Sequence, residues 1–201
     1  MAVSMSQIGN DWGYTEYVTW VSKPDIFFVL NYLNMTLLTA LAVILMSLLF
    51  AFAKELNRLA AISGLVFIPI YGVLNIISYS IQIAIVPRLA SLALSAEPPT
   101  IFLVFELIQA NQNSFIGFVN GMAYAIVGIP SILYGYILIQ NRKPLSGWFL
   151  LLNGIACIIG IIGYMLKNPA LSSGSVIGGL LFLFSLGGMM WEFRDAAAYK
   201  G

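Results

Sequence analysis

Five long apolar stretches, separated by short polar breaks, constrain the fold of this chain more than any other feature. A helix needs about 20 predominantly apolar residues to cross the roughly 30 Å of hydrocarbon in a bilayer. The five stretches cover residues 25–53, 59–86, 114–139, 146–166 and 173–191, and each reaches or approaches that length. We therefore predict an all-α integral membrane bundle of about five transmembrane helices, forming a single membrane domain over residues 1–201.

The composition supports the same conclusion. Of 201 residues, 60% are hydrophobic and 8% are charged, whereas about 25% of residues are charged in an ordinary soluble domain. A water-soluble core of this size cannot hide so much apolar surface, so the lipid bilayer is the expected surrounding. The net charge is only +1 and no basic run is present, which argues against binding to nucleic acid.

Polar segments with prolines mark the ends of the predicted spans. The sequence Ser22-Lys23-Pro24-Asp25 precedes the first span and fits a helix-capping box with proline in the first turn. Further breaks lie at residues 54–58, at 142–144 and at 167–169, and each combines a basic residue with a helix-ending signal.

The segment between the second and third spans predicts a short helix that does not cross. Pro98 and Pro99 should interrupt any helix, because each proline removes a donor and clashes with the preceding turn. With Thr100 as its cap, an interfacial or re-entrant helix is expected over 101–112. Glu106, Gln109 and Asn113 would then share one stripe at i, i+3 and i+7.

Polar side chains inside the spans form the candidate site. Asn75, Tyr79 and Gln82 fall at i, i+4 and i+7, so they share one face of the second span. They predict either hydrogen bonds between helices or one wall of an outward-facing polar pocket. The other residues expected to line such a pocket are Asn31, Asn34, Glu106, Gln109, Asn113, Asn120 and Tyr124.

Within that pocket, Glu106 would be the ionisable group. If the short helix inserts, Glu106 is a candidate for binding a proton or a small polar ligand. If the helix lies at the headgroups, Glu106 is an ordinary solvated carboxylate.

The sequence lacks the residues that most cofactors and catalytic sites require. Histidine is absent and Cys157 is the single cysteine, which removes the usual ligands of haem, zinc and copper. There is no Gly-x-Ser-x-Gly elbow, no phosphate-binding glycine loop and no pair of acids within a span. We expect no metal, no cofactor and no enzymatic activity.

Glycines in the last three spans predict close helix packing. They are Gly117, Gly121, Gly128, Gly154, Gly160, Gly163, Gly178, Gly179, Gly187 and Gly188. Small residues let transmembrane helices approach closely, within one chain or between chains. The expected function is therefore that of an accessory, scaffold or assembly subunit packed against other integral membrane proteins. The alternative is a transporter-like protein that binds a small molecule or lipid in the outward-facing polar pocket.

The distribution of basic residues predicts the orientation. Six lie on one side of the five spans (Lys54, Arg58, Arg142, Lys143, Arg194 and Lys200) and three on the other (Lys23, Arg88 and Lys167). Because basic residues favour the cytoplasmic side, we expect the N-terminus outside and the C-terminus in the cytoplasm. An aromatic belt at the outer boundary would then comprise Trp12, Tyr14, Tyr17 and Trp20, with Trp148 and Trp191 at the inner boundary.

Overall fold

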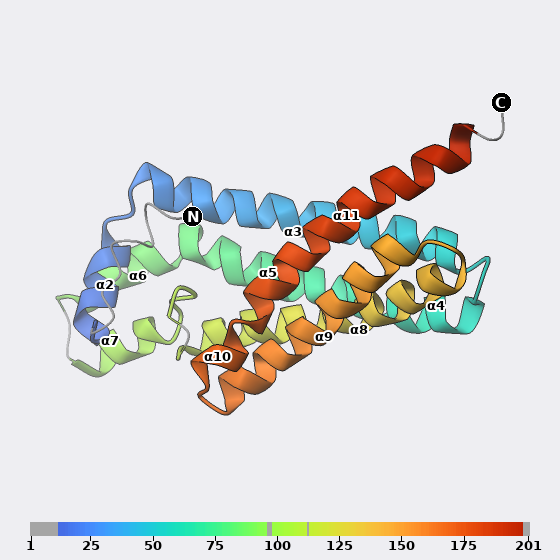
Figure 1. Cartoon of the computed structure of the whole chain (residues 1–201). Coiled ribbons are helices and arrows are strands. Elements are labelled where there is room, and N and C mark those ends of the chain that lie inside the picture. Colours follow the sequence, from blue (N-terminus) through green and yellow to red (C-terminus); the bar gives the residue numbers. More distant parts are fainter. Residues whose placement is uncertain (1–11, 96–97, 112, 199–201) are drawn as a thin grey trace. The chain divides into compact units, whose positions relative to one another are not determined.

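The structure, a computed structural model, describes residues 12–95, 98–111 and 113–198, and in that part the regular elements are all helices, without strands (Figure 1). The helices are α2 (Tyr14–Ser22), α3 (Ile26–Ala53), α4 (Arg58–Leu65), α5 (Phe67–Ala84), α6 (Val86–Ala93), α7 (Pro98–Phe105), α8 (Phe115–Gln140), α9 (Pro144–Met165), α10 (Pro169–Ser172) and α11 (Gly174–Ala198).

Five helical segments of the described chain are long and apolar enough to cross a membrane. They are Ile26–Ala53, Arg58–Ala84, Phe115–Gln140, Pro144–Met165 and Pro169–Arg194. The second combines α4 and α5, which are separated at Val66. That break is expected because the ring of Pro69 clashes with the carbonyl four residues earlier. The prediction of five apolar helices of this length is confirmed.

The predicted start of the first span is close, but its cap is a different residue. Ser22 is the last residue of α2, and the carboxylate of Asp25 accepts a hydrogen bond of 2.7 Å from the backbone N–H of Phe28. Asp25 therefore caps α3, and Pro24 precedes the helix instead of occupying its first turn. Asn57 and Asn168 cap α4 and α10 in the same way, through their side-chain oxygens.

The predicted helix over 101–112 is wrong in extent. Helix α7 begins at Pro98 and ends at Phe105, because prolines are tolerated in a first turn where the N–H groups have no intrahelical acceptor. Beyond it, Leu107 and Ile108 bond to carbonyls only three residues back, and the chain then turns toward α8. Glu106, Gln109 and Asn113 consequently share no helical stripe, and Gln112 lies outside the described residues.

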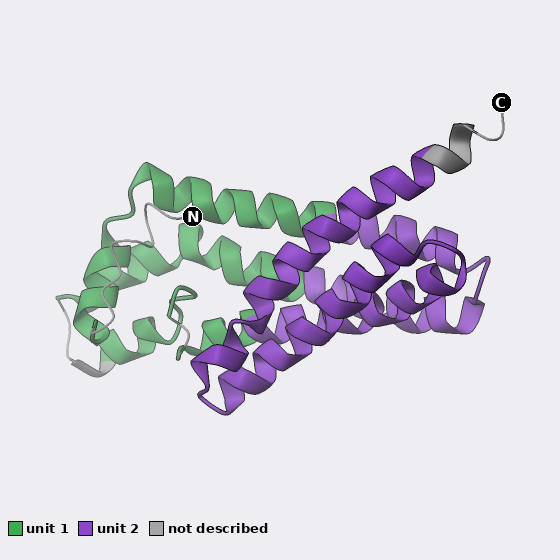
Figure 2. Cartoon of the chain, in the orientation of Figure 1, with its two compact units in different colours: residues 1–41, 73–120 green, residues 42–72, 121–201 purple. Residues whose placement is uncertain are grey.

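The chain divides into two compact units, and the border between them falls within α3, α5 and α8 (Figure 2). Unit 1 contains residues 1–41 and 73–120, and unit 2 contains residues 42–72 and 121–201.

In unit 1, the short helices α2, α6 and α7 pack against one another (Figure 1). We call these three helices the cap. Their inward side chains form one core with residues of α3 and α5, comprising Val18, Val21, Phe28, Tyr32, Tyr79, Val86, Ala90, Ala93, Val104, Phe105 and Ile108.

In unit 2, glycines bring helices into backbone contact. A Cβ added to Gly154 of α9 would lie 2.3 Å from the carbonyl oxygen of Gly128 in α8, and one added to Gly147 would lie 2.8 Å from that of Gly135. Helices α9 and α11 meet similarly, since a Cβ on Gly174 would lie 2.5 Å from the carbonyl oxygen of Ala156. Close packing in the C-terminal half is confirmed.

Candidate functional site

One face of α5 carries a continuous row of buried polar side chains. Asn75, Ser78 and Gln82 are fully buried and Tyr79 is 1% exposed, whereas Val73 and Ile77 on the opposite face are more than half exposed. This arrangement is expected in an apolar surrounding, because polar groups that face lipid are costly. The prediction that Asn75, Tyr79 and Gln82 share a face is confirmed, and that face points into unit 1.

Gln82 attaches the chain after α7 to α5. Its Nε2 donates to the carbonyl of Leu107 at 2.9 Å and to that of Ser78 at 3.1 Å. Its Oε1 accepts from the backbone N–H of Gln109 at 3.1 Å. Because residues 106–111 form no regular helix, their backbone groups need such partners, and the Gln82 amide supplies two of them. Gln82 thus positions this segment.

Glu106 and Ser114 close the N-terminus of α8. The Glu106 carboxylate accepts from the backbone N–H of Phe115 at 2.7 Å, and the Ser114 hydroxyl accepts from that of Gly117 at 2.9 Å. The first N–H groups of a helix lack intrahelical acceptors and carry partial positive charge. Glu106 is therefore part of a helix cap in this structure.

Unlike Gln82, Glu106 and Ser114, the amide of Asn75 and the hydroxyl of Tyr32 make no hydrogen bond to the described residues. Both side chains are at most 1% exposed, yet neither the Asn75 nitrogen and oxygen nor the Tyr32 oxygen has a hydrogen-bond partner among the described residues. The ring of Tyr32 in α3 lies 6.3 Å from that of Tyr79, which is one turn from Asn75 in α5. Unit 1 thus contains buried polar groups that the described residues leave unsatisfied.

The remaining residues predicted to line the pocket differ in exposure and in the unit to which they belong. Asn31 is 9% exposed on α3, while Asn34 and Asn113 are exposed. Gln109 and Asn120 each have one buried side-chain oxygen without a partner. Tyr124 belongs to unit 2, where its ring lies 6.2 Å from that of Tyr71.

Tyr32 and Ser114 are not among the site residues predicted from the sequence. A serine directly before an apolar run is a capping signal that identifies Ser114, and Tyr32 follows Asn31 but has no polar spacing of its own.

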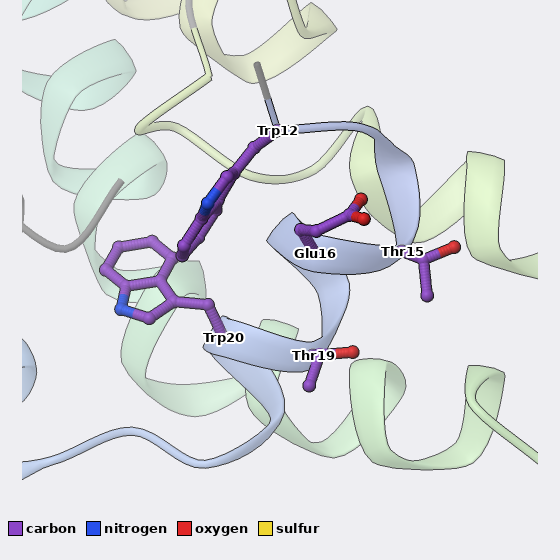
Figure 3. Close-up of a pocket in the computed structure, with 5 residues that line it drawn as sticks. All are labelled: Trp12, Thr15, Glu16, Thr19 and Trp20. Carbon is purple, nitrogen blue, oxygen red and sulfur yellow. The ribbon is translucent and has the colours of Figure 1, made fainter. Parts of the chain in front are cut away.

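The outer surface of α2 has a shallow depression of about 480 Å³ lined by Trp12, Thr15, Glu16, Thr19 and Trp20 (Figure 3). The two indole rings lie edge to face with centroids 6.2 Å apart, and the Glu16 carboxylate is directed away from them. These groups do not converge on a common point.

Two residues of the predicted aromatic belt pack inward, Trp20 against Phe28 and Tyr17 against Phe105. The partial burial of Tyr17 raises the pKa of its phenol.

Helix α11 in unit 2 presents an exposed apolar face that includes two glycines. Nothing in the described structure lies within 4 Å of a Cβ added to Gly179 or Gly187. Large apolar side chains alternate with these glycines at spacings of three and four residues, namely Val176, Leu180, Leu183 and Met190, each more than half exposed.

Over the described residues, the chain is thus a helical protein with five helical segments long and apolar enough to span a membrane. No family model, curated protein or solved structure matches the chain.

Proposed function

We propose that this chain is a multi-pass integral membrane protein that acts, without catalysis, as an accessory or assembly subunit. Its binding surface for another membrane protein is the exposed face of α11, defined by Val176, Gly179, Leu180, Leu183, Gly187 and Met190. The two outward glycines of this face are the observation on which the proposal rests.

Glycine on a lipid-facing surface requires an explanation. In a helix interior it is less favourable than alanine by roughly 1 kcal/mol, and at Gly179 and Gly187 no internal contact offsets that loss. Between transmembrane helices, by contrast, small residues are enriched because they let two backbones approach and pack. A helix from a partner protein would make use of these two positions.

Helix α3 provides the contrast. Its exposed stripe consists of large aliphatic side chains without glycine, namely Leu30, Leu33, Leu37, Leu41, Ile44 and Leu48. Such a surface suits fluid lipid tails, which need no close backbone approach. The difference between α3 and α11 favours α11 as the docking helix.

Site-specific photocrosslinking in native membranes tests this proposal. A photoreactive amino acid at Leu183, between the two glycines, should yield a discrete protein adduct, whereas the same probe at Leu37 of α3 should yield only lipid adducts. Gly187→Leu should abolish the Leu183 adduct because the added side chain separates the helices. Ala51→Leu, at an exposed small residue of α3, is the matched control and should leave it unchanged.

Two results would contradict the proposal. Lipid adducts alone from Leu183 would show that the face meets the bilayer. An adduct with twice the 22.0 kDa mass of the chain would show pairing with a second copy in place of an accessory role.

We further propose that the N-terminus is outside and the C-terminus is in the cytoplasm. The support is the division of Lys and Arg, six against three, across the five apolar helices. In this orientation the cap of unit 1 lies at the outer surface.

A further inference from the structure

We infer that the carboxamide of Asn75, on the buried face of α5, binds a small uncharged molecule that both donates and accepts hydrogen bonds. This inference is independent of the accessory function and concerns the other unit. It starts from an amide that is 0% exposed and whose nitrogen and oxygen both lack a partner among the described residues.

Gln82 shows what a buried amide on this face normally does. Two turns from Asn75 and equally buried, it makes three hydrogen bonds with both ends of its amide. Most buried polar groups in proteins have a partner, either protein or ordered water, because an unsatisfied group destabilises the fold. Asn75 is therefore expected to have a partner that is not part of the chain.

The polar groups on α5 and α3 indicate the polarity of that partner. On α5, Ser78 bonds within its own helix to the carbonyl of Leu74 at 2.7 Å, and Tyr79 lies one turn away. The ring of Tyr32, centred 6.3 Å from that of Tyr79, carries a second buried group without a partner among the described residues, its hydroxyl. An amide and a hydroxyl offer both donors and acceptors, which suits water or a solute of a few heavy atoms.

The absence of buried charge in the described part of unit 1 argues for an uncharged ligand. Glu16, Lys23, Asp25 and Arg88 are exposed, and the carboxylate of Glu106 caps α8. An ion of either sign would lose its hydration without gaining a buried counter-charge. The shared chemistry of the ligand is thus that of water or of a neutral solute such as glycerol.

Nuclear magnetic resonance of asparagine-labelled protein in nanodiscs tests the inference directly. The side-chain amide of Asn75, assigned by its loss in Asn75→Ser, should show a cross-relaxation peak to water at mildly acidic pH, where amide protons exchange slowly. Glycerol is then added at molar concentration. A peak from its carbon-bound protons would identify a neutral solute that enters the site, and persistence of the water peak alone would identify resident water.

Thermal unfolding provides the second readout. Asn75→Leu removes the hydrogen-bonding groups and should lower the unfolding midpoint more than Ser78→Ala does, because the Ser78 hydroxyl is equally buried but bonds only within its helix. If no cross-peak from water or glycerol reaches the Asn75 amide, the inference is wrong. It is equally wrong if Asn75→Leu is as stable as the unmodified protein or more stable, since the amide would then lack a partner.

Discussion

Glu106 and Glu192 perform the same structural task at single-residue scale, each closing the N-terminus of a long apolar helix. Glu106 accepts from the N–H of Phe115 in α8, and Glu192 accepts from those of Leu145 and Ser146 in α9 at 2.9 and 3.2 Å. Helix N-termini need acceptors and favour negative charge. In both places a carboxylate from another part of the chain supplies both.

Replacing Glu106 by alanine should therefore lower the free energy of unfolding by about 1 kcal/mol, as is typical for the loss of a helix cap. Glu106→Gln should lose less, since the amide oxygen still accepts from Phe115. Chemical unfolding in detergent measures both changes. Glu16→Ala is the control, because that carboxylate is exposed on α2 and makes no cap bond; an equal loss there would refute the capping role.

Gln82→Leu should be more damaging. It leaves the carbonyl of Leu107 and the N–H of Gln109 without their partner, and each buried unsatisfied group costs about 1–3 kcal/mol. Hydrogen exchange should show lost protection of the Gln109 amide, with faster exchange across residues 106–111. Unchanged protection there would mean that Gln82 does not position this segment.

For single residues, the sequence predicts which face of a helix a side chain occupies better than it predicts what that side chain bonds to. Periodicity placed Asn75, Tyr79 and Gln82 on one face, because helical spacing is a local property. It could not show that Gln82 is satisfied while Asn75 is not, since the partners of Gln82 lie 25 and 27 residues away in an irregular segment. The role of Glu106 likewise depends on how the chain turns back onto α8.

At the scale of elements, glycines determine how α8 and α9 pack. Gly128 and Gly154 place the two backbones so close that neither position has room for a side chain. Leucine at such a position forces the helices apart, and overpacking of a close interface costs typically 1–3 kcal/mol or more.

We expect Gly154→Leu to lower the unfolding midpoint strongly or to prevent folding. Gly187→Leu is the matched control on α11, because nothing in the described structure lies within 4 Å of its added Cβ. In purified protein that control should be neutral or slightly stabilising, since leucine favours helix more than glycine does. Circular dichroism on heating compares them, and equal losses would show that the α8–α9 contact is not special.

The long helices could be predicted from the sequence more accurately than the short helices α2 and α7, and the reason is physical. The long helices follow from apolar length alone, so their predicted bounds are close to those observed. Helix α2 has 9 residues and lacks a long apolar run; its packing against α6 and α7 stabilises it, and such tertiary contacts leave no local pattern. The end of α7 at Phe105 also depends on contacts of the following segment, which the polar spacing of Glu106, Gln109 and Asn113 does not reveal.

At the scale of the whole molecule, the proposed orientation follows from charge near the ends of the apolar helices. Arg142 and Lys143 lie between α8 and α9, Lys54 lies between α3 and α4, and Arg58 is the first residue of α4. With an odd number of crossings, both turns and the C-terminus share a side opposite to α2. Positive residues are retained in the cytoplasm during insertion, so the side with six of them should face inward.

Cysteine labelling in intact cells tests that orientation. The natural Cys157 is buried and is replaced by serine, so that only an introduced cysteine can react. Thr15→Cys, at an exposed position of α2, should react with a membrane-impermeant maleimide, whereas Arg142→Cys should react only after the cells are permeabilised. The reverse pattern would invert the topology and place the cap of unit 1 in the cytoplasm. Labelling of both positions in intact cells would instead show that they lie on the same side. Three crossings between them do not allow that, so one of the three apolar segments between Thr15 and Arg142 would have to leave the membrane.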